Sequence, residues 1–352
     1  MTNETTSWSD FLQLQGASGE TFNGKTLADE AGVTDWVTDL SDRVVVNVTG
    51  ADAGDFLQAQ FCNDVAALDP ATGHAAQLNG YCNPKGRLLA LFHLVAQSEN
   101  GSEATGYRMI LPAGIAEAFV KRLRMFVLRA QVEFTVLDQG CHILGIGGAQ
   151  AFTALEGLFP AGHPSSEATD YSVEETRGMT VIKLPADRWM LVVDEDAAID
   201  VWTALSAHLQ CVGLNRWNLA GIGAGEPVLH AGNVEQIIPQ MLNLQAVDGL
   251  SFKKGCYPGQ EIVARMQYLG KLKRRMHRVA IDSAVLPDAG VKLTAGDDAD
   301  AGVVVTAATG ADNKTHALVV IKDKVDIAQL SAEHVTGDFS SLDLPYALET
   351  VE

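Results

Sequence analysis

The apolar pattern in the first part of the chain predicts a strand, an amphipathic helix, three further strands and a second helix. These elements are expected at 43–49, 53–61, 75–79, 88–96, 107–111 and 115–128. The first strand is rich in β-branched residues, and residues 83–87 have the composition of a turn. Strands and helices joined by short links predict an α+β layer, with helices packed on an antiparallel sheet.

The middle of the chain predicts a second unit of the same kind. Strands are expected at 141–146, 180–184 and 189–193, helices at 149–158 and 196–209, and a long loop at 161–176. Residues 210–270 return to helix and loop character. Short strands then follow at regular spacing, separated by Gly- and Asp-rich turns, which predicts a small sandwich or barrel. They are expected at 276–281, 291–293, 302–308 and 316–321.

Composition narrows the class of protein. A chain of 352 residues with 47% hydrophobic content is too long for one ordinary domain and has ample material for cores. No apolar run approaches the roughly 20 residues that span a bilayer. The polar N-terminus lacks the features of a secretory signal, so we expect a cytoplasmic protein with no membrane contact.

Several common site types find no support in the sequence. The five cysteines are dispersed and odd in number, which disfavours a disulfide framework or a zinc site. The nine histidines show no ligand spacing, so no metal site is expected. The glycine clusters at 145–150 and 221–226 end in Gln150 and Glu226, where a dinucleotide fingerprint needs a small residue.

Positive charge is concentrated in one segment of an acidic chain. The net charge is −19, yet residues 253–278 contain eight lysines and arginines against one acid, Glu261. Such a patch can steer a phosphate or a carboxylate toward the protein. A solvated strand face whose charges only aid solubility is the alternative interpretation, and the sequence leaves both open.

The densest chemistry lies in Lys253-Lys254-Gly255-Cys256-Tyr257-Pro258-Gly259-Gln260-Glu261. Cys256 precedes a predicted helix at 260–266, and its neighbours include two lysines. A helix N-terminus and nearby cations favour the thiolate form of a cysteine. Gly255 is expected to permit a positive φ or a close backbone approach. In the alternative interpretation, the glycines only shape the backbone and Cys256 fills a pocket.

Residues 252–265, continued by 268–274, resemble the signature of the YgfZ family. The resemblance extends to 238–244, to 50–65 and to 83–87, and it covers roughly residues 43–280. These are folate-binding proteins implicated in the maintenance of iron–sulfur enzymes and in tRNA modification. They share their fold with the T-protein, the aminomethyltransferase of glycine cleavage.

The resemblance implies an α+β fold with a T-protein-like ring of domains. A first α+β domain would comprise 1–131 and 210–270. A second α+β domain, inserted in the first, would comprise 132–209. A C-terminal β-barrel would comprise 271–352.

The resemblance also implies a cofactor and its site. The chain would bind tetrahydrofolate or a derivative and support iron–sulfur enzymes or their assembly factors. Cys256 would be the working thiol, with Lys254 and Arg265 setting its charge state. The segment 271–278 would receive an anion, either a polyglutamate tail or tRNA. The cofactor-binding residues would be Trp217, Lys254, Tyr257, Gln260, Glu261 and Arg265, although a core position is the alternative for Trp217.

Three positions depart from the related families. Aminomethyltransferases have an acidic pair shortly after the position of Gly86, whereas this chain has Arg87-Leu88-Leu89-Ala90. Where the related families have a glutamate that is expected to hold the pterin, this chain has Gly223. Glu226 follows three residues further on. Arg43 stands where some members have a tryptophan. A folate-dependent one-carbon transferase is therefore the second hypothesis, and a non-catalytic RNA- or protein-binding adaptor is the third.

Overall fold

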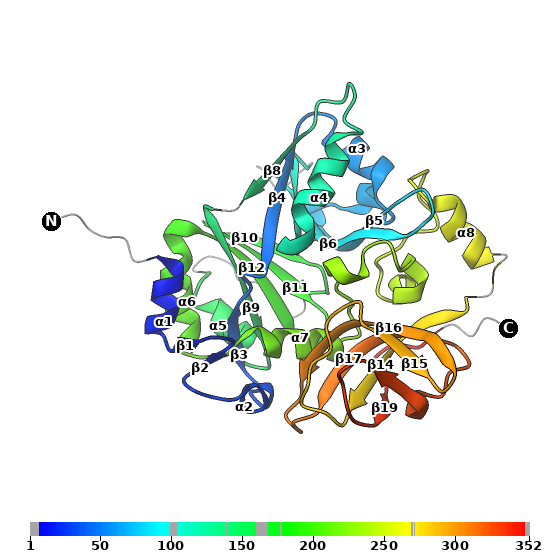
Figure 1. The fold of residues 1–352 in the computed structure, drawn as a ribbon. Helices are drawn as coiled ribbons and strands as arrows, with labels where there is room; N and C mark the ends of the chain where they lie inside the picture. The colour runs from blue at the N-terminus through cyan, green and yellow to red at the C-terminus, as the bar shows by residue number, and fades with distance from the viewer. Residues whose placement is uncertain are drawn as a thin grey trace.

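The computed structural model describes residues 7–98, 104–137, 139–159, 168–176, 178–268, 270 and 272–348. Three main sheets surround a shared core (Figure 1). The predicted α+β class and the T-protein-like arrangement are confirmed. In the described part of the chain, none of the helices combines the length and the apolar character needed to cross a membrane.

The first sheet is a five-stranded antiparallel layer covered on one face by two helices. Its order is β5 (Ala76–Cys82), β6 (Leu88–Gln97), β7 (Gly106–Pro112), β4 (Arg43–Thr49) and β8 (Glu133–Leu137). The covering helices are α3 (Ala53–Gln60) and α4 (Ala113–Arg124). Because side chains alternate along a strand, Val44, Val46 and Val48 of β4 face these helices, whereas Val45 faces the shared core.

The second sheet has six strands, antiparallel except at one edge. Its order is β10 (Val173–Thr176), β11 (Met179–Leu184), β12 (Arg188–Asp194), β9 (Cys141–Gly147), β3 (Trp36–Asp39) and β13 (Gln210–Cys211), where β13 runs parallel to β3. One face carries α1 (Trp8–Leu14), α5 (Ala151–Glu156) and α6 (Glu195–Ser206). A small ribbon of β1 (Ala17–Ser18) and β2 (Thr21–Phe22) and the short α2 (Leu27–Ala31) connect α1 to β3.

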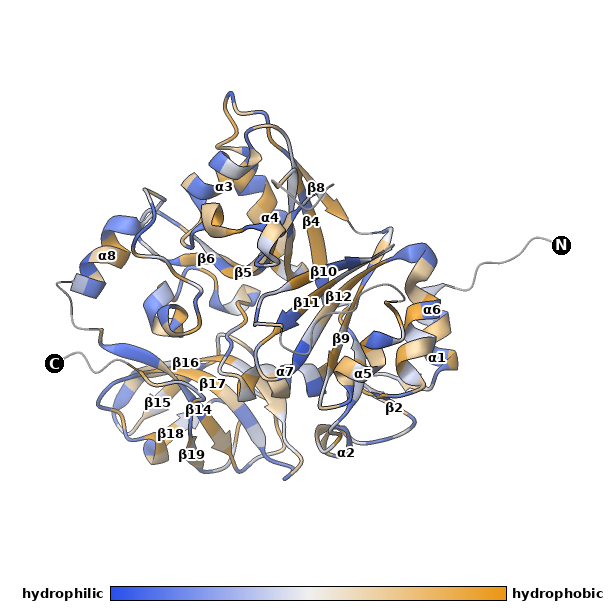
Figure 2. Cartoon of the chain, turned by 180° about the vertical axis from the view of Figure 1, so that it is seen from behind, coloured by the Kyte–Doolittle hydropathy of each residue, from blue (hydrophilic) through white to orange (hydrophobic). Residues whose placement is uncertain are grey.

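The third sheet is a curled, antiparallel half-barrel, which corresponds to the predicted C-terminal barrel. Its order is β18 (Leu330–Ala332), β15 (Lys292–Ala295), β16 (Asp298–Thr309), β17 (Thr315–Lys322), β14 (Arg274–Ile281) and β19 (Phe339–Leu342). Helix α7 (Leu214–Gly223) packs between this sheet and the second one. Figure 2 shows orange, hydrophobic residues concentrated along the strands, whereas α8 (Gln260–Tyr268) carries much blue.

Strand pairing does not follow the chain order assumed for the domains. β8 lies beyond residue 131 but pairs with β4, and Phe134 packs in the core under α4. β3 lies before residue 131 but pairs with β9 of the second sheet. β8 thus forms an edge of the first sheet, and β3 lies between β9 and β13 in the second. The domain limits as such stay a prediction.

One predicted loop is wrong in part. Residues 173–176 of the expected loop at 161–176 form β10, which pairs with β11 in register from Val173↔Ile182 to Thr176↔Met179. The Ser/Glu-rich composition hid this strand, because an edge strand with little buried surface needs few apolar residues. Residues 160–167 lie outside the described residues.

Candidate functional site

Lys254 holds the cysteine loop against the end of α3. The residue is 7% exposed, and its ammonium donates to the carbonyls of Gln58, Phe61 and Asn63, at 2.6, 2.5 and 3.0 Å. Carbonyls at a helix end have no partner within the helix, and a cation there also meets the negative end of the helix dipole. Burial lowers the pKa of Lys254 to about 8. The charged ammonium of Lys254 therefore binds the carbonyls at the end of α3.

Asn63 connects the segment after α3 to β5 and to the loop around residue 248. Its backbone N–H donates to the Asn79 side chain at 2.9 Å, and its amide donates to the carbonyls of Leu78 and Asp248, at 2.9 and 2.6 Å. The side-chain amide of Gln58 also donates to the carboxylate of Asp64, at 2.8 Å. The polar residues of the 50–65 signature thus join β5 to the loop around residue 248.

The turn at 83–87 packs directly on the start of α8. The Asn83 side-chain oxygen accepts from the backbone N–H groups of Lys85 and Arg87, at 2.9 and 3.1 Å, which closes the turn. Gly259 has φ +83°, and a Cβ built there would lie 2.4 Å from the Asn83 carbonyl oxygen. Glycine is therefore required at 259. Gly255 has neither a positive φ nor an atom within 4 Å of a built Cβ, so the expectation for it is wrong.

The cysteine loop contains both buried and exposed residues. Cys256 is exposed, between the buried Lys254 and Tyr257. The Lys254 ammonium lies 5.3 Å from the centre of the Tyr257 ring, and burial raises the pKa of Tyr257. The Gln260 amide donates to the carbonyls of Lys254 and Gly255, both at 3.4 Å. Lys254, Tyr257 and Gln260 thus come together around Cys256 and shape its loop.

Two further predicted site residues lie on the surface. Glu261 and Arg265 are exposed on α8, beyond the buried Val263. The helix is anchored from below by Gln240, whose amide donates to the Val263 carbonyl at 2.6 Å. Glu261 and Arg265 are therefore free to meet a ligand or a partner from solvent.

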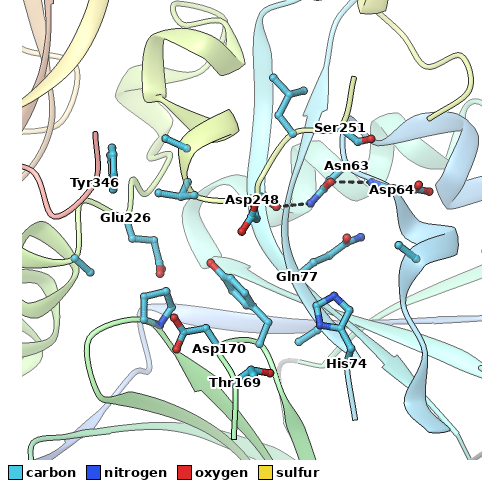
Figure 3. A pocket seen from close by; sticks show the side chains of 18 of the residues that line it. Asn63, Asp64, His74, Gln77, Thr169, Asp170, Glu226, Asp248, Ser251 and Tyr346 are labelled. Carbon is cyan, nitrogen blue, oxygen red and sulfur yellow. Dashed lines mark hydrogen bonds between the residues drawn. The ribbon is translucent and has the colours of Figure 1, made fainter. Parts of the chain in front are cut away.

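A cavity of ≈ 920 Å³, here called the central cavity, lies where the first sheet, the second sheet and the C-terminal segment meet (Figure 3). Four carboxylates line it, those of Asp64, Asp170, Glu226 and Asp248. Lys253 also lines it, three residues before Cys256. The remaining polar lining is supplied mainly by Asn63, His74, Gln77, Thr169, Tyr171, Ser251 and Tyr346.

Glu226 is a buried charge at the edge of this cavity. Its carboxylate accepts from the Arg188 guanidinium at 2.9 Å and lies 3.3 Å from Nε2 of His93. Burial by itself would raise the pKa of Glu226, but Arg188 and then His93 outweigh it and hold that pKa well below its usual value. Glu226 is thus a fixed anion.

Trp217 lies behind Glu226 and outside the lining of the central cavity. It is 3% exposed and packs edge-on against Trp36, with ring centres 6.0 Å apart. The guanidinium of Arg188 lies 5.3 Å from the centre of the Trp217 ring, and that of Arg43 lies 5.9 Å from it. The structure therefore places Trp217 in the core, one layer removed from the cavity.

Two polar atoms lining the central cavity lack a partner. The amide nitrogen of Gln77 and the hydroxyl of Tyr171 are buried and make no hydrogen bond. Burial, then the charge of Glu226, raises the pKa of Tyr171 well above its usual value, so the hydroxyl keeps its proton. Buried polar groups are normally bonded. These two therefore mark places where a ligand or water would bond.

The positive segment is partly neutralised by the third sheet. Arg274 pairs with Asp300 at 2.7 Å, and Arg275 lies 3.9 Å from Asp323. Lys273 is exposed, and Lys271 lies outside the described residues. Across the described ranges, no three His, Cys, Asp or Glu side chains gather in a way that could hold a metal ion.

Comparison with known proteins identifies the family. No family model matches the chain. Over 320 residues the chain is 31% identical to the tRNA-modifying protein YgfZ of Enterobacter sp. (strain 638), an alignment that covers 88% of this chain and 93% of the relative. The same-named protein of Serratia proteamaculans (strain 568) is 33% identical over 315 residues, covering 88% and 92%.

The chain belongs to the YgfZ family. Among solved structures, the glycine cleavage system aminomethyltransferase T from Bartonella henselae matches with a TM-score of 0.69 and 17% identity, covering 91% of this chain and 88% of that one. At this identity the match establishes the fold alone. It confirms the predicted T-protein-like architecture for this YgfZ-family chain.

Several residues of the site were not predicted from the sequence. Arg188, His93, Gln77 and Tyr171 carry no motif, and each acquires a role only when the sheets bring distant segments together. Arg188, for example, meets a carboxylate 38 residues away. Glu226 had one signal, its place three residues beyond Gly223 in the family's pattern.

We expect Lys254→Met to lower the free energy of unfolding by about 2–4 kcal/mol, because three carbonyls at the end of α3 lose a charged donor. Urea denaturation of the full chain measures the change. Lys253→Met is the matched control, since Lys253 is exposed, and it should change the stability by less than about 0.5 kcal/mol. Equal effects of the two substitutions would contradict the role of Lys254.

We expect Glu226→Gln to destabilise the protein by about 3–5 kcal/mol at pH 7, because Arg188 becomes an unpaired buried cation. The ordinary carboxyl pKa is 4.5 and the folded value lies well below it. The ion pair therefore contributes fully above about pH 4.5 and loses its contribution as the pH falls toward the folded pKa.

Urea denaturation from pH 7 to pH 3 tests this pH dependence. The difference between the unmodified chain and Glu226→Gln should hold steady down to about pH 5 and shrink below it. Asp170→Asn, an exposed carboxylate of the same cavity, is the control and should change little. A difference that does not vary with pH would show that the Glu226 charge is not its source.

Proposed function

We propose that this chain is a cytoplasmic folate-binding protein of the YgfZ family, which supports the assembly or repair of iron–sulfur enzymes, tRNA-modifying ones included. The observation that carries the proposal is the central cavity, whose lining runs through Lys253 into the loop of Cys256. A ligand cavity and an exposed thiol thus share one short segment of backbone. The curated relatives bear the name tRNA-modifying protein.

The lining of the central cavity fits a reduced folate. The pterin end of a folate presents several N–H donors and a carbonyl acceptor, and its other end carries carboxylates. Carboxylates such as Asp248 and Asp64 suit the donors, and the unpartnered Gln77 amide nitrogen suits the carbonyl. Lys253 suits the carboxylate end. When bound, the folate would supply one-carbon carrying capacity.

Glu226 and Trp217 would act as a support for this ligand. The pair of Glu226 and Arg188 fixes a negative charge at the cavity edge, and Trp217 packs against Arg188 from the core. We propose that Trp217 affects folate binding through Arg188 and Glu226, since it does not line the cavity. An anion that is already paired costs little reorganisation when a ligand arrives.

The residues around Cys256 would present the thiol. Lys254, Tyr257 and Gln260 hold the loop by contacts beneath it, so that Cys256 is exposed at a fixed position. Arg265 and Glu261, exposed on α8, would meet the folate tail or the client protein. Within the described residues 272–278, the exposed Lys273 would attract an anionic partner such as tRNA, whereas Arg274 is paired with Asp300.

A one-carbon transferase is less well supported. Leu88 and Ala90 are buried, and the Arg87 guanidinium donates to the carbonyls of Glu235 and Gln236, at 3.0 and 2.8 Å. The segment that holds the acidic pair in aminomethyltransferases therefore offers no carboxylate here. Nothing in this segment could provide the acid or base that such a transfer uses.

Calorimetric titration of the full chain with tetrahydrofolate tests the ligand. We expect binding, and Gln77→Leu should weaken it by roughly tenfold or more, because the ligand loses a buried donor. Gln13→Leu, an exposed position on α1, is the control and should bind like the unmodified chain. Undiminished affinity in Gln77→Leu, or no heat at high tetrahydrofolate concentration, would count against the folate site.

Complementation of a strain that lacks this gene tests the thiol. We expect Cys256→Ala to leave iron–sulfur enzyme activity near the level of the empty strain, whereas Cys211→Ala, a half-buried cysteine of β13, restores it. If Cys256→Ala restored full activity while Lys273→Glu with Arg274→Glu abolished it, the chain would be an adaptor that works through its positive segment.

A further inference from the structure

A second cavity, of ≈ 580 Å³, lies where the N-terminal helix meets the first two sheets. Its walls come from the start of α1, the start of β4, the end of β8 and the start of β9. It shares no lining residue with the central cavity. The proposed folate site does not use it.

Arg43 is a positively charged side chain that lines this cavity. Its side chain is 6% exposed, and among the described residues its guanidinium makes no hydrogen bond, although its Nε atom is buried. The Asp42 carboxylate lies 3.8 Å from Nε, beyond hydrogen-bonding distance. The face of Trp217 lies 5.9 Å from the guanidinium, and Arg43 also lines a small pocket together with His93 and Glu226. An arginine carries five donors in a planar fork, and leaving them unbonded when buried is costly.

Among the residues that the structure describes, the other charged groups lining the cavity have partners. Asp39 accepts from the indole N–H of Trp8 at 3.0 Å. Glu195 lies 2.9 Å from Nε2 of His142, and the His142 ring stacks on Trp8 with ring centres 4.5 Å apart. Among the described lining residues, Arg43 is therefore the charged group that has an ion-pair neighbour, Asp42, but no hydrogen bond.

The remaining walls narrow the class of ligand. Apolar side chains of Val44, Val45, Leu137 and Ile143 line the cavity next to Arg43. One guanidinium matches one carboxylate in a two-bond fork. A phosphate dianion would stay under-neutralised beside Asp39 and Glu195, and it would gain nothing from apolar walls.

We propose that this cavity is a second ligand site, which binds a small carboxylic acid with an apolar body through Arg43. The carboxylate would accept from the guanidinium, and the apolar body would lie against the walls contributed by β4, β8 and β9. Trp8 would stand at the edge of the bound ligand as part of α1.

Calorimetric titration of the full chain with three probes tests the proposal. Phenylacetate should bind, whereas phenylacetamide, which has the same shape and no charge, should bind at least roughly tenfold more weakly. Inorganic phosphate should bind more weakly than phenylacetate. Equal affinity for phenylacetate and phenylacetamide, tighter binding of phosphate, or no binding of phenylacetate would each overturn the proposal.

Two variants place the binding in this cavity. Arg43→Met should remove the preference for phenylacetate over phenylacetamide. Because loss of Arg43 also disturbs Trp217, Ala113→Phe serves as a second variant: Ala113 is exposed and lines the cavity, so a larger side chain would fill it from outside the core. Loss of phenylacetate binding in a folded Ala113→Phe chain supports the site, and unchanged binding there overturns it.

Discussion

The contact between the Lys254 ammonium and three backbone carbonyls is the constraint on which the site depends. The helix α3 ends at a point where its carbonyls face inward, and the chain returns about 190 residues later to supply the donor. A charged group can satisfy several acceptors at once, which few neutral side chains do. The loop of Cys256 is attached to the first sheet by this contact. Its exposure and its position relative to the central cavity follow from it.

The elements with strong periodicity were predicted from the sequence. The strand at 43–49 matches β4 to the residue, because its alternation of buried faces leaves little freedom in register. The strands β3 and β13 have four and two residues, too few for any periodicity to appear. The exchange of β3 and β8 between sheets was out of reach as well, since pairing across distant segments leaves no local signal.

The site shows the same division between local and distant information. The sequence indicated that 252–265 is a special segment, and the structure brings it together with the 50–65 and 83–87 signatures. It assigned the close backbone approach to Gly255, whereas the structure has it at Gly259, whose backbone meets the turn at 83–87. It also grouped Lys254 with Cys256 by nearness in sequence, whereas the structure buries Lys254 against the end of α3 and leaves Cys256 exposed. Arg188 and Glu226 form a pair that composition alone could not reveal.

Trp217 has a consequence for charge that reaches beyond its packing. Two guanidinium groups, those of Arg43 and Arg188, lie near one indole ring in the core. Like charges in a poorly solvated region repel strongly, and the electron-rich ring face offers each of them a compensating attraction. Each guanidinium also has an anion beside it, Asp42 for Arg43 and Glu226 for Arg188, so the indole supplements two ion pairs in one part of the core. A smaller side chain at this position would take the ring face away from both arginines at once.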